Sequence, residues 1–208
     1  MNDAQSADSI RNPTITALIL AGGQAARMGG VDKGLVECAG QPLIARVLHK
    51  VEPLVGNVLI SANRNLPTYA AYGYPVLCDS RTGYSGPLAG IESGLRACET
   101  EYLWIVPCDA PLFEAELLQR LVRACLESAC AAVVPTDDMR VHATFALLHS
   151  DVRPSLQEFL TAGKRKARDW LSGLPAIAVD CSDHAEWFTN INTVEDLEAC
   201  QHRIRSMS

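Results

Sequence analysis

Short, continuously apolar segments alternate along this chain with segments in which apolar residues recur at helical spacing. A strand that is apolar at nearly every position is buried on both faces, which is typical of a parallel sheet covered by helices on each side. The alternation therefore predicts an α/β fold, a three-layer α/β/α sandwich with a Rossmann-like, mostly parallel sheet. The predicted strands are residues 16–21, 57–62, 74–79, 102–109, 130–135 and 176–181.

Amphipathic segments between these strands predict the helices of the two outer layers. The last helix has its own local signal, because Thr193 and Asp196 have the spacing of a capping box. One further segment, RVHATFALLH at 140–149, alternates between polar and apolar residues and predicts an antiparallel or an edge strand. The predicted helices are residues 42–54, a short stretch near 68, 87–98, 114–125, 152–162, 166–172 and a final helix from 194.

The length of 208 residues suits one well-packed domain. The first residues, MNDAQSADSIRNP, are polar, so we expect a flexible N-terminal tail over 1–13 and a single domain over 14–208. This start lacks the basic and apolar regions of a signal peptide, and no apolar run approaches the ~20 residues that span a bilayer. We therefore expect a cytoplasmic protein that does not bind membranes.

Composition excludes some classes of function. Acidic side chains outnumber basic ones by 24 to 18, which leaves no broad basic surface of the kind that binds nucleic acid. The eight cysteines include no CxxC pair, and the chain shows no export signal. We therefore interpret them as reduced, mostly buried thiols rather than as a disulfide framework or a zinc site.

The stretch LILAGGQAARMGGVDKGL, at 18–35, leaves a predicted buried strand and continues into a long glycine-rich loop. It is not a Walker A loop, because Asp32 rather than glycine precedes Lys33, and it lacks the GxGxxG pattern of dinucleotide-binding loops. Glycines let backbone N–H groups approach anionic oxygens, while Arg27 and Lys33 supply positive charge. The pattern predicts a polyphosphate site, although a plain connection with two solvated cations has the same composition.

Two aspartates follow predicted strands in the same local sequence, Cys-Asp. Asp79 and Asp109 would both emerge at the carboxyl edge of a parallel sheet. Magnesium commonly binds through one or two carboxylates together with substrate phosphates, so this pair is a candidate Mg²⁺ site. Each aspartate is equally suited to capping the helix that follows it.

Two other features admit both a functional and a structural interpretation. The segment GKRKAR is locally basic and either receives an anionic second substrate or forms a solvated helix start. Asn190 and Asn192 precede the final helix, where asparagine is an ordinary turn residue. The basic residues of the segment GKRKAR are Lys164, Arg165, Lys166 and Arg168.

The loop segment LAGGQAARMGGVDKGL resembles the signature of the molybdenum cofactor guanylyltransferases. Four later segments resemble stretches of this family in the expected order, so that the resemblance covers about 16–197. The chain departs from the family pattern at Ser61, where an asparagine is frequent, and at Lys166, where an arginine is frequent. The four segments are GPLAGI at 86–91, VPCDAP at 106–111, HAT at 142–144 and FTNINTVEDL at 188–197.

This resemblance implies a sandwich of the nucleotide-diphospho-sugar transferase type and roles for individual residues. Arg27, Lys33 and Asp109 would be catalytic, and Asp109 would also hold the cofactor Mg²⁺. The implied nucleotide-binding residues are Leu20, Ala21, Gly22, Gly23, Lys33, Ser61, Asp79 and Asp109. The implied pterin-side residues are Lys164, Arg165, Lys166, Asn190 and Asn192.

The resemblance further implies transfer of GMP from GTP to molybdenum-bound molybdopterin, which forms the guanine dinucleotide cofactor and releases pyrophosphate. Two alternatives remain open: a nucleotidyltransferase that uses CTP or acts on a sugar phosphate, and a non-catalytic carrier of nucleotide or pterin. GTP and molybdenum-molybdopterin are the implied substrates. We expect a monomer that makes transient contact with molybdopterin-delivering proteins and with acceptor molybdoenzymes.

Overall fold

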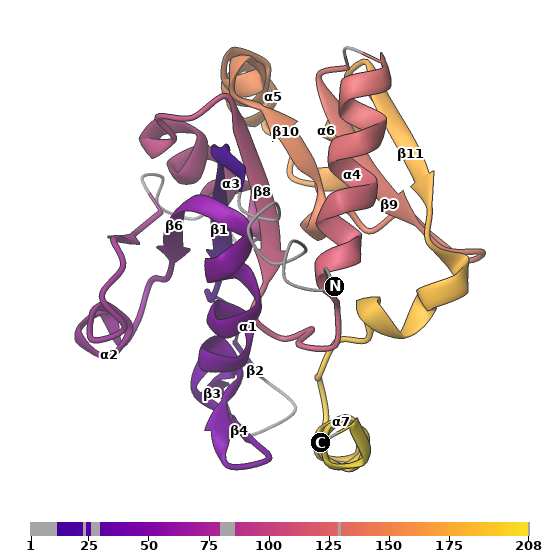
Figure 1. The fold of residues 1–208 in the computed structure, drawn as a ribbon. Coiled ribbons are helices and arrows are strands. Elements are labelled where there is room, and N and C mark those ends of the chain that lie inside the picture. Colours follow the sequence, from indigo (N-terminus) through magenta and orange to yellow (C-terminus); the bar gives the residue numbers. More distant parts are fainter. Residues whose placement is uncertain (1–11, 23, 26–29, 80–85, 129, 208) are drawn as a thin grey trace, which may run out of the picture.

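A seven-stranded sheet forms the centre of the molecule (Figure 1). The structure is a computed structural model and describes residues 12–22, 24, 25, 30–79, 86–128 and 130–207. The strand order is β11-β9-β10-β8-β1-β6-β7, and every neighbouring pair is parallel except the two that involve β10. The strands are β1 (Asn12–Leu20), β6 (Val55–Ser61), β7 (Val76–Leu77), β8 (Tyr102–Pro107), β9 (Ala132–Thr136), β10 (Leu147–His149) and β11 (Ala176–Asp180).

Helices cover both faces of this sheet, which confirms the predicted three-layer sandwich (Figure 1). Side chains of α1 and α4 pack in one hydrophobic cluster, and side chains of α3, α5 and α6 pack in another. None of the helices in the described part of the chain is long and apolar enough to cross a membrane. The helices are α1 (Leu43–Val51), α2 (Leu66–Ala70), α3 (Pro87–Ala97), α4 (Ala115–Ser128), α5 (Arg153–Thr161), α6 (Ala167–Leu171) and α7 (Val194–Met207).

Alternate residues of the central strands face opposite helical layers. In β1, Ala17 and Ile19 belong to the cluster with α1 and α4, whereas Leu18 belongs to the cluster with α3 and α5. In β8, Trp104 and Ile105 divide between the two clusters in the same way. Both faces of these strands are dry, which explains why their sequences are continuously apolar.

The antiparallel alternative for the segment 140–149 is confirmed, whereas the edge alternative is wrong. Strand β10 lies inside the sheet and pairs in antiparallel register with β8 and β9. It can do so because the chain turns back directly after β9, where Thr136 pairs with Val141 in an isolated bridge. A strand that returns through so short a turn must run opposite to the one that it leaves.

The glycine-rich region, for which the sequence predicts no regular element, contains two short hairpins. The first pairs β2 (Gln24–Ala25) with β3 (Val31–Asp32), and the second pairs β4 (Glu37–Cys38) with β5 (Gln41–Pro42). Ala39 and Gly40 connect the second pair, both with positive φ. Two positive φ values in a two-residue loop match the twist of an antiparallel hairpin.

The start of the last helix and the end of the helix predicted at 42–54 both follow from local sequence. Oγ1 of Thr193 accepts a hydrogen bond from Asp196 N at 3.1 Å, and Oδ2 of Asp196 accepts one from Thr193 N at 2.9 Å, as the capping box predicts. The predicted helix at 42–54 ends at Val51 as an α-helix and continues as one 3-10 turn over Glu52–Leu54. Proline at position 53 explains this change, because it cannot donate to an earlier carbonyl.

The cysteines are free thiols, as predicted, and five of the eight are buried. Cys38 and Cys200 approach each other to 3.7 Å between their sulfur atoms. They belong to a small third cluster with Leu43, Leu112 and Ile191, which joins α7 to the β4–β5 hairpin. Helix α7 thereby lies against the glycine-rich region although it is the last element of the chain.

Candidate functional site

The carboxyl ends of β1, β6 and β8 lie level with one another. Leu20 is paired with Ser61 on one side and with Pro107 on the other. The backbone continues this pairing past the strands, because Ala21 N donates to Ser61 O at 2.8 Å and Cys108 N donates to Leu20 O at 3.1 Å. The loops after these strands therefore meet at one edge of the sheet, where open α/β sheets bind their ligands.

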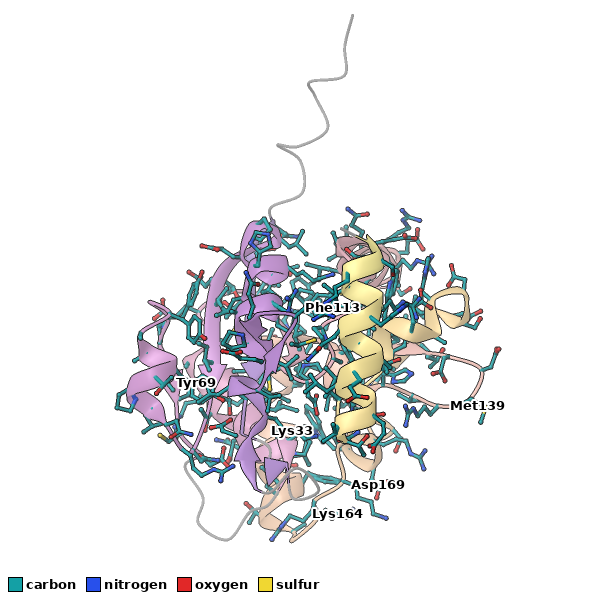
Figure 2. All side chains as sticks on the ribbon, turned by 90° about the horizontal axis from the view of Figure 1, so that it is seen from below. Lys33, Tyr69, Phe113, Met139, Lys164 and Asp169 are labelled. Atoms are coloured by element: carbon teal, nitrogen blue, oxygen red, sulfur yellow. The ribbon has the colours of Figure 1, made fainter. Side chains whose placement is uncertain are left out.

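Lys33 joins three distant parts of the chain at this edge. Its Nζ donates to Oδ2 of Asp109 at 2.9 Å and to Oδ1 of Asn192 at 2.6 Å. Asp109 follows β8, and Asn192 precedes α7. The residue before Asn192 also contacts Asp109, because Ile191 N donates to Asp109 O at 2.8 Å. In the view from below, Lys33 lies near the middle of the molecule, beside α7 (Figure 2). The structure thus brings together three of the predicted site residues.

Asp79 is held by a residue that our sequence analysis missed. Nδ2 of Asn63 donates to Oδ2 of Asp79 at 2.8 Å, and Asp79 N donates back to Oδ1 of Asn63 at 2.9 Å. Burial raises the pKa of Asp79, while the hydrogen bond from Asn63 opposes this shift by favouring the carboxylate. Asn63 follows β6 within the segment SANRN, which contains a second asparagine, Asn65, and the sequence gives no reason to prefer one over the other.

Ser61 is at the predicted edge, but its side chain is buried. A Cβ built on Gly90 would lie 2.4 Å from Oγ of Ser61, so the hydroxyl faces the first turns of α3. Gly90 therefore allows α3 to pack directly against the end of β6. Leu20 and Ala21 reach the same edge through the backbone bonds described above, and Gly22 follows them as an exposed residue. Gly23 and Arg27 lie outside the described residues.

The predicted pterin-side residues fall into two groups. Lys164, Arg165 and Lys166 are exposed in the connection between α5 and α6. Lys164 lies over the ring of Phe159, with Nζ 5.4 Å from the ring centroid. No hydrogen bond or ion pair within the described ranges links these three cations to Lys33 or Asp109. Asn192 contacts Lys33, whereas the side chain of Asn190 is exposed.

Asp109 has the chemistry of a magnesium ligand. Its side chain is 15% exposed, and Oδ1 has no hydrogen-bond partner among the described residues, which leaves a hard anionic oxygen for a cation. The part of the chain that the structure describes contains no cluster of three or more His, Cys, Asp and Glu residues that would form an all-protein metal cage. The donor set fits an ion that is shared with a substrate phosphate.

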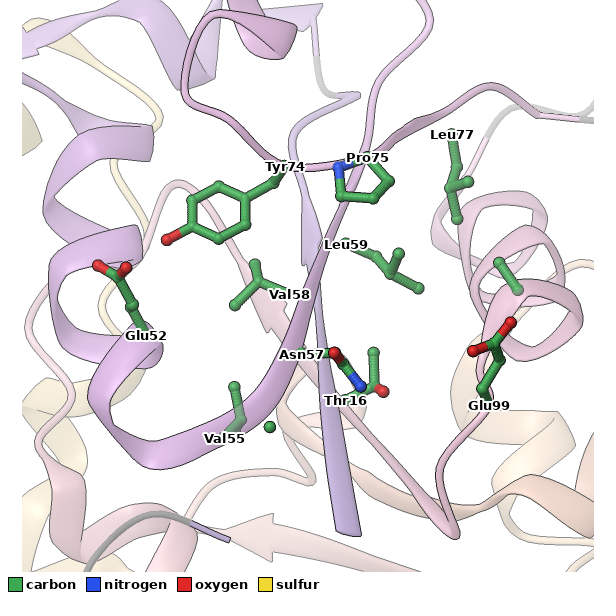
Figure 3. A pocket seen from close by; sticks show the side chains of 12 residues that line it. Thr16, Glu52, Val55, Asn57, Val58, Leu59, Tyr74, Pro75, Leu77 and Glu99 are labelled. Carbon is green, nitrogen blue, oxygen red and sulfur yellow. The ribbon is translucent and has the colours of Figure 1, made fainter. Parts of the chain in front are cut away.

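A separate cavity of 460 Å³ opens beside β6, where the short strand β7 leaves the first half of β6 uncovered (Figure 3). Its lining includes Asn57 and Tyr74 but none of the predicted site residues. Two carboxylates, Glu52 and Glu99, stand on its walls, and its lining residues include no lysine or arginine. Because like charges repel, this cavity is unsuited to a triphosphate, and the carboxyl edge of the sheet remains the candidate site.

Comparison with known proteins identifies the family of this chain. Residues 17–179 match the family model described as the MobA-like NTP transferase domain. The molybdenum cofactor guanylyltransferase of Shewanella loihica is 41% identical over 93% of this chain and 98% of its own length. The protein of the same name from Polynucleobacter asymbioticus is 42% identical over 88% of this chain and 94% of its own length.

Solved structures share the fold. Molybdopterin-guanine dinucleotide biosynthesis protein A from Archaeoglobus fulgidus superposes with a TM-score of 0.78 at 23% identity, over 92% of this chain and all of the other. The 2-C-methyl-D-erythritol 4-phosphate cytidylyltransferase from Thermus thermophilus superposes with a TM-score of 0.70 at 16% identity, over 90% and 98% of the two chains. These structures confirm the Rossmann-like nucleotidyltransferase fold. By the family match and the identity to its relatives, the chain belongs to the molybdenum cofactor guanylyltransferases, a family of nucleotidyltransferase enzymes.

Proposed function

We propose that this chain transfers GMP from GTP to the phosphate of molybdenum-bound molybdopterin, forming the molybdopterin guanine dinucleotide cofactor and pyrophosphate. The observation that carries the proposal is the contact of Lys33 with Asp109 at the carboxyl edge of the sheet, at 2.9 Å. A cation and a carboxylate held together beside a glycine-rich loop are the groups that a magnesium-bound triphosphate requires.

The chemistry makes few demands on side chains. A phosphate oxygen of the pterin substrate attacks the α-phosphorus of GTP, and the bond to the β-phosphate oxygen breaks, so that pyrophosphate leaves with the electron pair. The attacking oxygen is already ionised at neutral pH, so no strong general base is needed. The protein must align the two reactants and stabilise the charge that moves to pyrophosphate. The ammonium group of Lys33 is placed to supply such charge.

Asp109 would hold the metal ion. When bound there, magnesium would neutralise charge on the substrate phosphates. With Asp109 holding that ion, Nζ of Lys33 would be free of its ion pair with Asp109 and could turn to a phosphate oxygen. Oδ1 of Asn192 would still accept a hydrogen bond from the same nitrogen, 2.6 Å long in this structure, and would limit how far the lysine side chain moves.

Asp79 would bind the nucleoside part of GTP. The Asn63 amide takes up one oxygen of Asp79 and leaves the other available to accept N–H groups. Guanine offers two adjacent N–H donors on one edge, whereas cytosine offers one amino group, so an oriented carboxylate favours guanine. The exposed cations Lys164, Arg165 and Lys166 would receive the phosphate of the second substrate.

The purified protein, incubated with Mg²⁺, molybdenum-molybdopterin and either GTP, CTP or ATP, tests the proposal through pyrophosphate release. We expect turnover with GTP and little with the other two nucleotides. The double variant Lys164→Ala/Lys166→Ala should raise KM for the pterin substrate and leave KM for GTP unchanged. Preferential use of CTP would replace guanylyl by cytidylyl transfer. Nucleotide binding without any pyrophosphate would indicate a carrier instead of an enzyme.

We further propose that the chain works as a cytoplasmic monomer. It would receive its pterin substrate from molybdopterin-delivering proteins and hand the product to acceptor molybdoenzymes through transient contacts. Light scattering of the purified protein tests the monomer directly. A stable dimer at micromolar concentration would contradict it.

A further inference from the structure

A fully buried tyrosine lies beneath the loop that carries Lys33. Tyr69 is 0% exposed, and its hydroxyl donates a hydrogen bond to Oδ1 of Asp32, the residue before Lys33. The other oxygen of Asp32 accepts a hydrogen bond from Nδ2 of Asn65 at 2.9 Å. Both oxygens of the Asp32 carboxylate are therefore held from one segment of the chain, at and just before α2.

Gly34, the residue after Lys33, leaves room for the same tyrosine. A Cβ built on Gly34 would lie 2.4 Å from the hydroxyl oxygen of Tyr69 and 3.2 Å from two of its ring carbons. Any side chain at position 34 would thus push the tyrosine away from Asp32. Glycine is required here for close approach, since Gly34 has no positive φ that would demand it. Asp32 and Gly34 together fix the backbone on both sides of Lys33.

The segment that holds Asp32 is rigid for local reasons. Asn65 has a left-handed backbone with φ 51°, and its carbonyl accepts hydrogen bonds from Thr68 N at 2.9 Å and Tyr69 N at 3.1 Å. Burial raises the pKa of Tyr69, and the hydrogen bond to Asp32 raises it further, so the hydroxyl stays protonated and remains a donor. We call this hydrogen bond from Tyr69 to Asp32 the anchor.

Tyr69 belongs to the hydrophobic core that it shares with β1, β6 and α1, so the anchor ties the loop to this core. The side chain of Lys33 donates hydrogen bonds elsewhere, to Asp109 and Asn192. Its side chain is only 13% exposed. Figure 2 shows Tyr69 well to one side of Lys33, which agrees with an effect that is transmitted through the backbone rather than by contact.

We infer that Tyr69, acting through Asp32, is a positioning residue that holds the backbone of Lys33 so that its ammonium group is presented at Asp109. The inference rests on the proposed guanylyl transfer for its kinetic consequence. Catalysis by a placed charge is sensitive to position, because a displacement of about 1 Å can cost up to ~100-fold in rate. Loss of the anchor should therefore lower kcat while GTP still binds through its other contacts.

The substitution Tyr69→Phe removes only the hydroxyl and keeps the buried ring. We expect kcat to fall by between about 10-fold and 100-fold, with KM for GTP unchanged. The matched control is Tyr72→Phe, because Tyr72 is partly buried in the same segment and no hydrogen bond within the described residues joins it to Asp32. The control should turn over like the unmodified protein.

Two measurements separate positioning from a general loss of structure. The first is the rate at which acetic anhydride acetylates Lys33, read by mass spectrometry, which should rise in Tyr69→Phe relative to acetylation of Lys50. The second is a double-mutant cycle. In an Asp32→Ala background, Tyr69→Phe should cause no further loss of kcat, because both substitutions remove the same link.

Asn65→Gly provides an independent variant if Tyr69→Phe does not fold. Glycine keeps the left-handed backbone at position 65 and removes only the amide that holds Asp32. Like Tyr69→Phe, this substitution should raise the acetylation rate of Lys33 relative to that of Lys50.

The inference is overturned if Lys33 acetylation is unchanged in Tyr69→Phe and Asn65→Gly, or if the kcat losses of Asp32→Ala and Tyr69→Phe add independently. Acetylation is read without turnover, so it tests the anchor even if the unmodified protein transfers no GMP. Absence of transfer by the unmodified protein would count against the proposed function alone. A raised acetylation rate would then still support the anchor.

Discussion

Nζ of Lys33 lies 2.9 Å from Oδ2 of Asp109, although 76 residues separate them along the chain. The lysine comes from the end of the glycine-rich region, and the aspartate follows the central strand β8. In the absence of substrate, each group neutralises the other. The pair is only 13% and 15% exposed, so neither charge would be stable at this edge without a partner. On the proposed function, a substrate that brings both phosphate and a metal ion would provide a new partner for each.

Replacing Asp109 by asparagine should lower turnover by at least about 100-fold, because it removes the charge that would hold Mg²⁺ and leaves a site of nearly the same shape. Initial rates of pyrophosphate release at saturating GTP measure this. Glu114→Gln is the control, since Glu114 also pairs with a lysine, Lys50 at 2.7 Å, but at an exposed position. Near-normal turnover in Asp109→Asn would remove this residue from the mechanism.

Asn63→Ala should raise KM for GTP about 10-fold, equivalent to ~1.4 kcal/mol, with a smaller effect on kcat. The alanine leaves both the carboxylate and the backbone N–H of Asp79 without the partners that Asn63 provides. Steady-state kinetics with varied GTP measure the change. Asn57→Ala in β6, at an exposed position away from the carboxyl edge, should behave normally. Equal KM values for the two variants would refute the role of Asn63.

Thr193→Ala should destabilise the protein by about 1 kcal/mol, because Asp196 N loses its acceptor at the first turn of α7. Thr193→Ser keeps the hydroxyl and should be close to neutral. Urea denaturation followed by circular dichroism measures both variants under the same conditions. The prediction is wrong if serine and alanine destabilise equally, since the effect would then arise from the lost methyl group.

His142 should make stability depend on pH. It is buried, stacks on Phe188 with ring centroids 3.8 Å apart and bonds Asp137 at 2.8 Å. Burial lowers its pKa below the ordinary value of 6.5, against the opposing influence of Asp137. Below pH 6.5 the unfolded chain therefore takes up a proton that the folded chain does not. The free energy of unfolding therefore decreases as the pH falls from 6.5 through the folded pKa of His142.

The free energy of unfolding, measured by urea titration between pH 8 and 5, should decline by at most about 1.4 kcal/mol per pH unit for this one proton. His142→Gln should flatten the slope in this range, whereas His202→Gln, at an exposed position, should leave it as it is. Identical slopes in all three proteins would show that His142 does not titrate differently in the folded and unfolded states.

Much of the fold follows from patterns that are local in the sequence. The predicted strands and helices appear in the predicted order, and the capping box at Thr193 forms as predicted. The exceptions have physical causes. The two hairpins of the glycine-rich region are too short to show periodicity, and the place of β10 inside the sheet depends on the turn after β9.

The candidate site was only partly predictable. Asp79 and Asp109 carry charges at the ends of apolar segments and Lys33 carries one in the glycine-rich loop, which made them visible as candidates. Asn63 and Tyr69 were not visible, because an amide or a tyrosine has many ordinary uses and their partners lie 16 and 37 residues away. The hydroxyl of Ser61 is buried against α3, which no local pattern indicates.

The sequence by itself determined that the chain folds into covered strands and that a glycine-rich segment with cationic residues follows one of them, because burial on two faces requires continuous apolar segments and glycine with cationic residues is a local composition. Only the tertiary structure decided which charges meet. The contact of Lys33 with Asp109 and Asn192 depends on the register of β1 and β8 and on the docking of α7, which arise from packing between distant segments. Periodicity along the chain carries no information about such register.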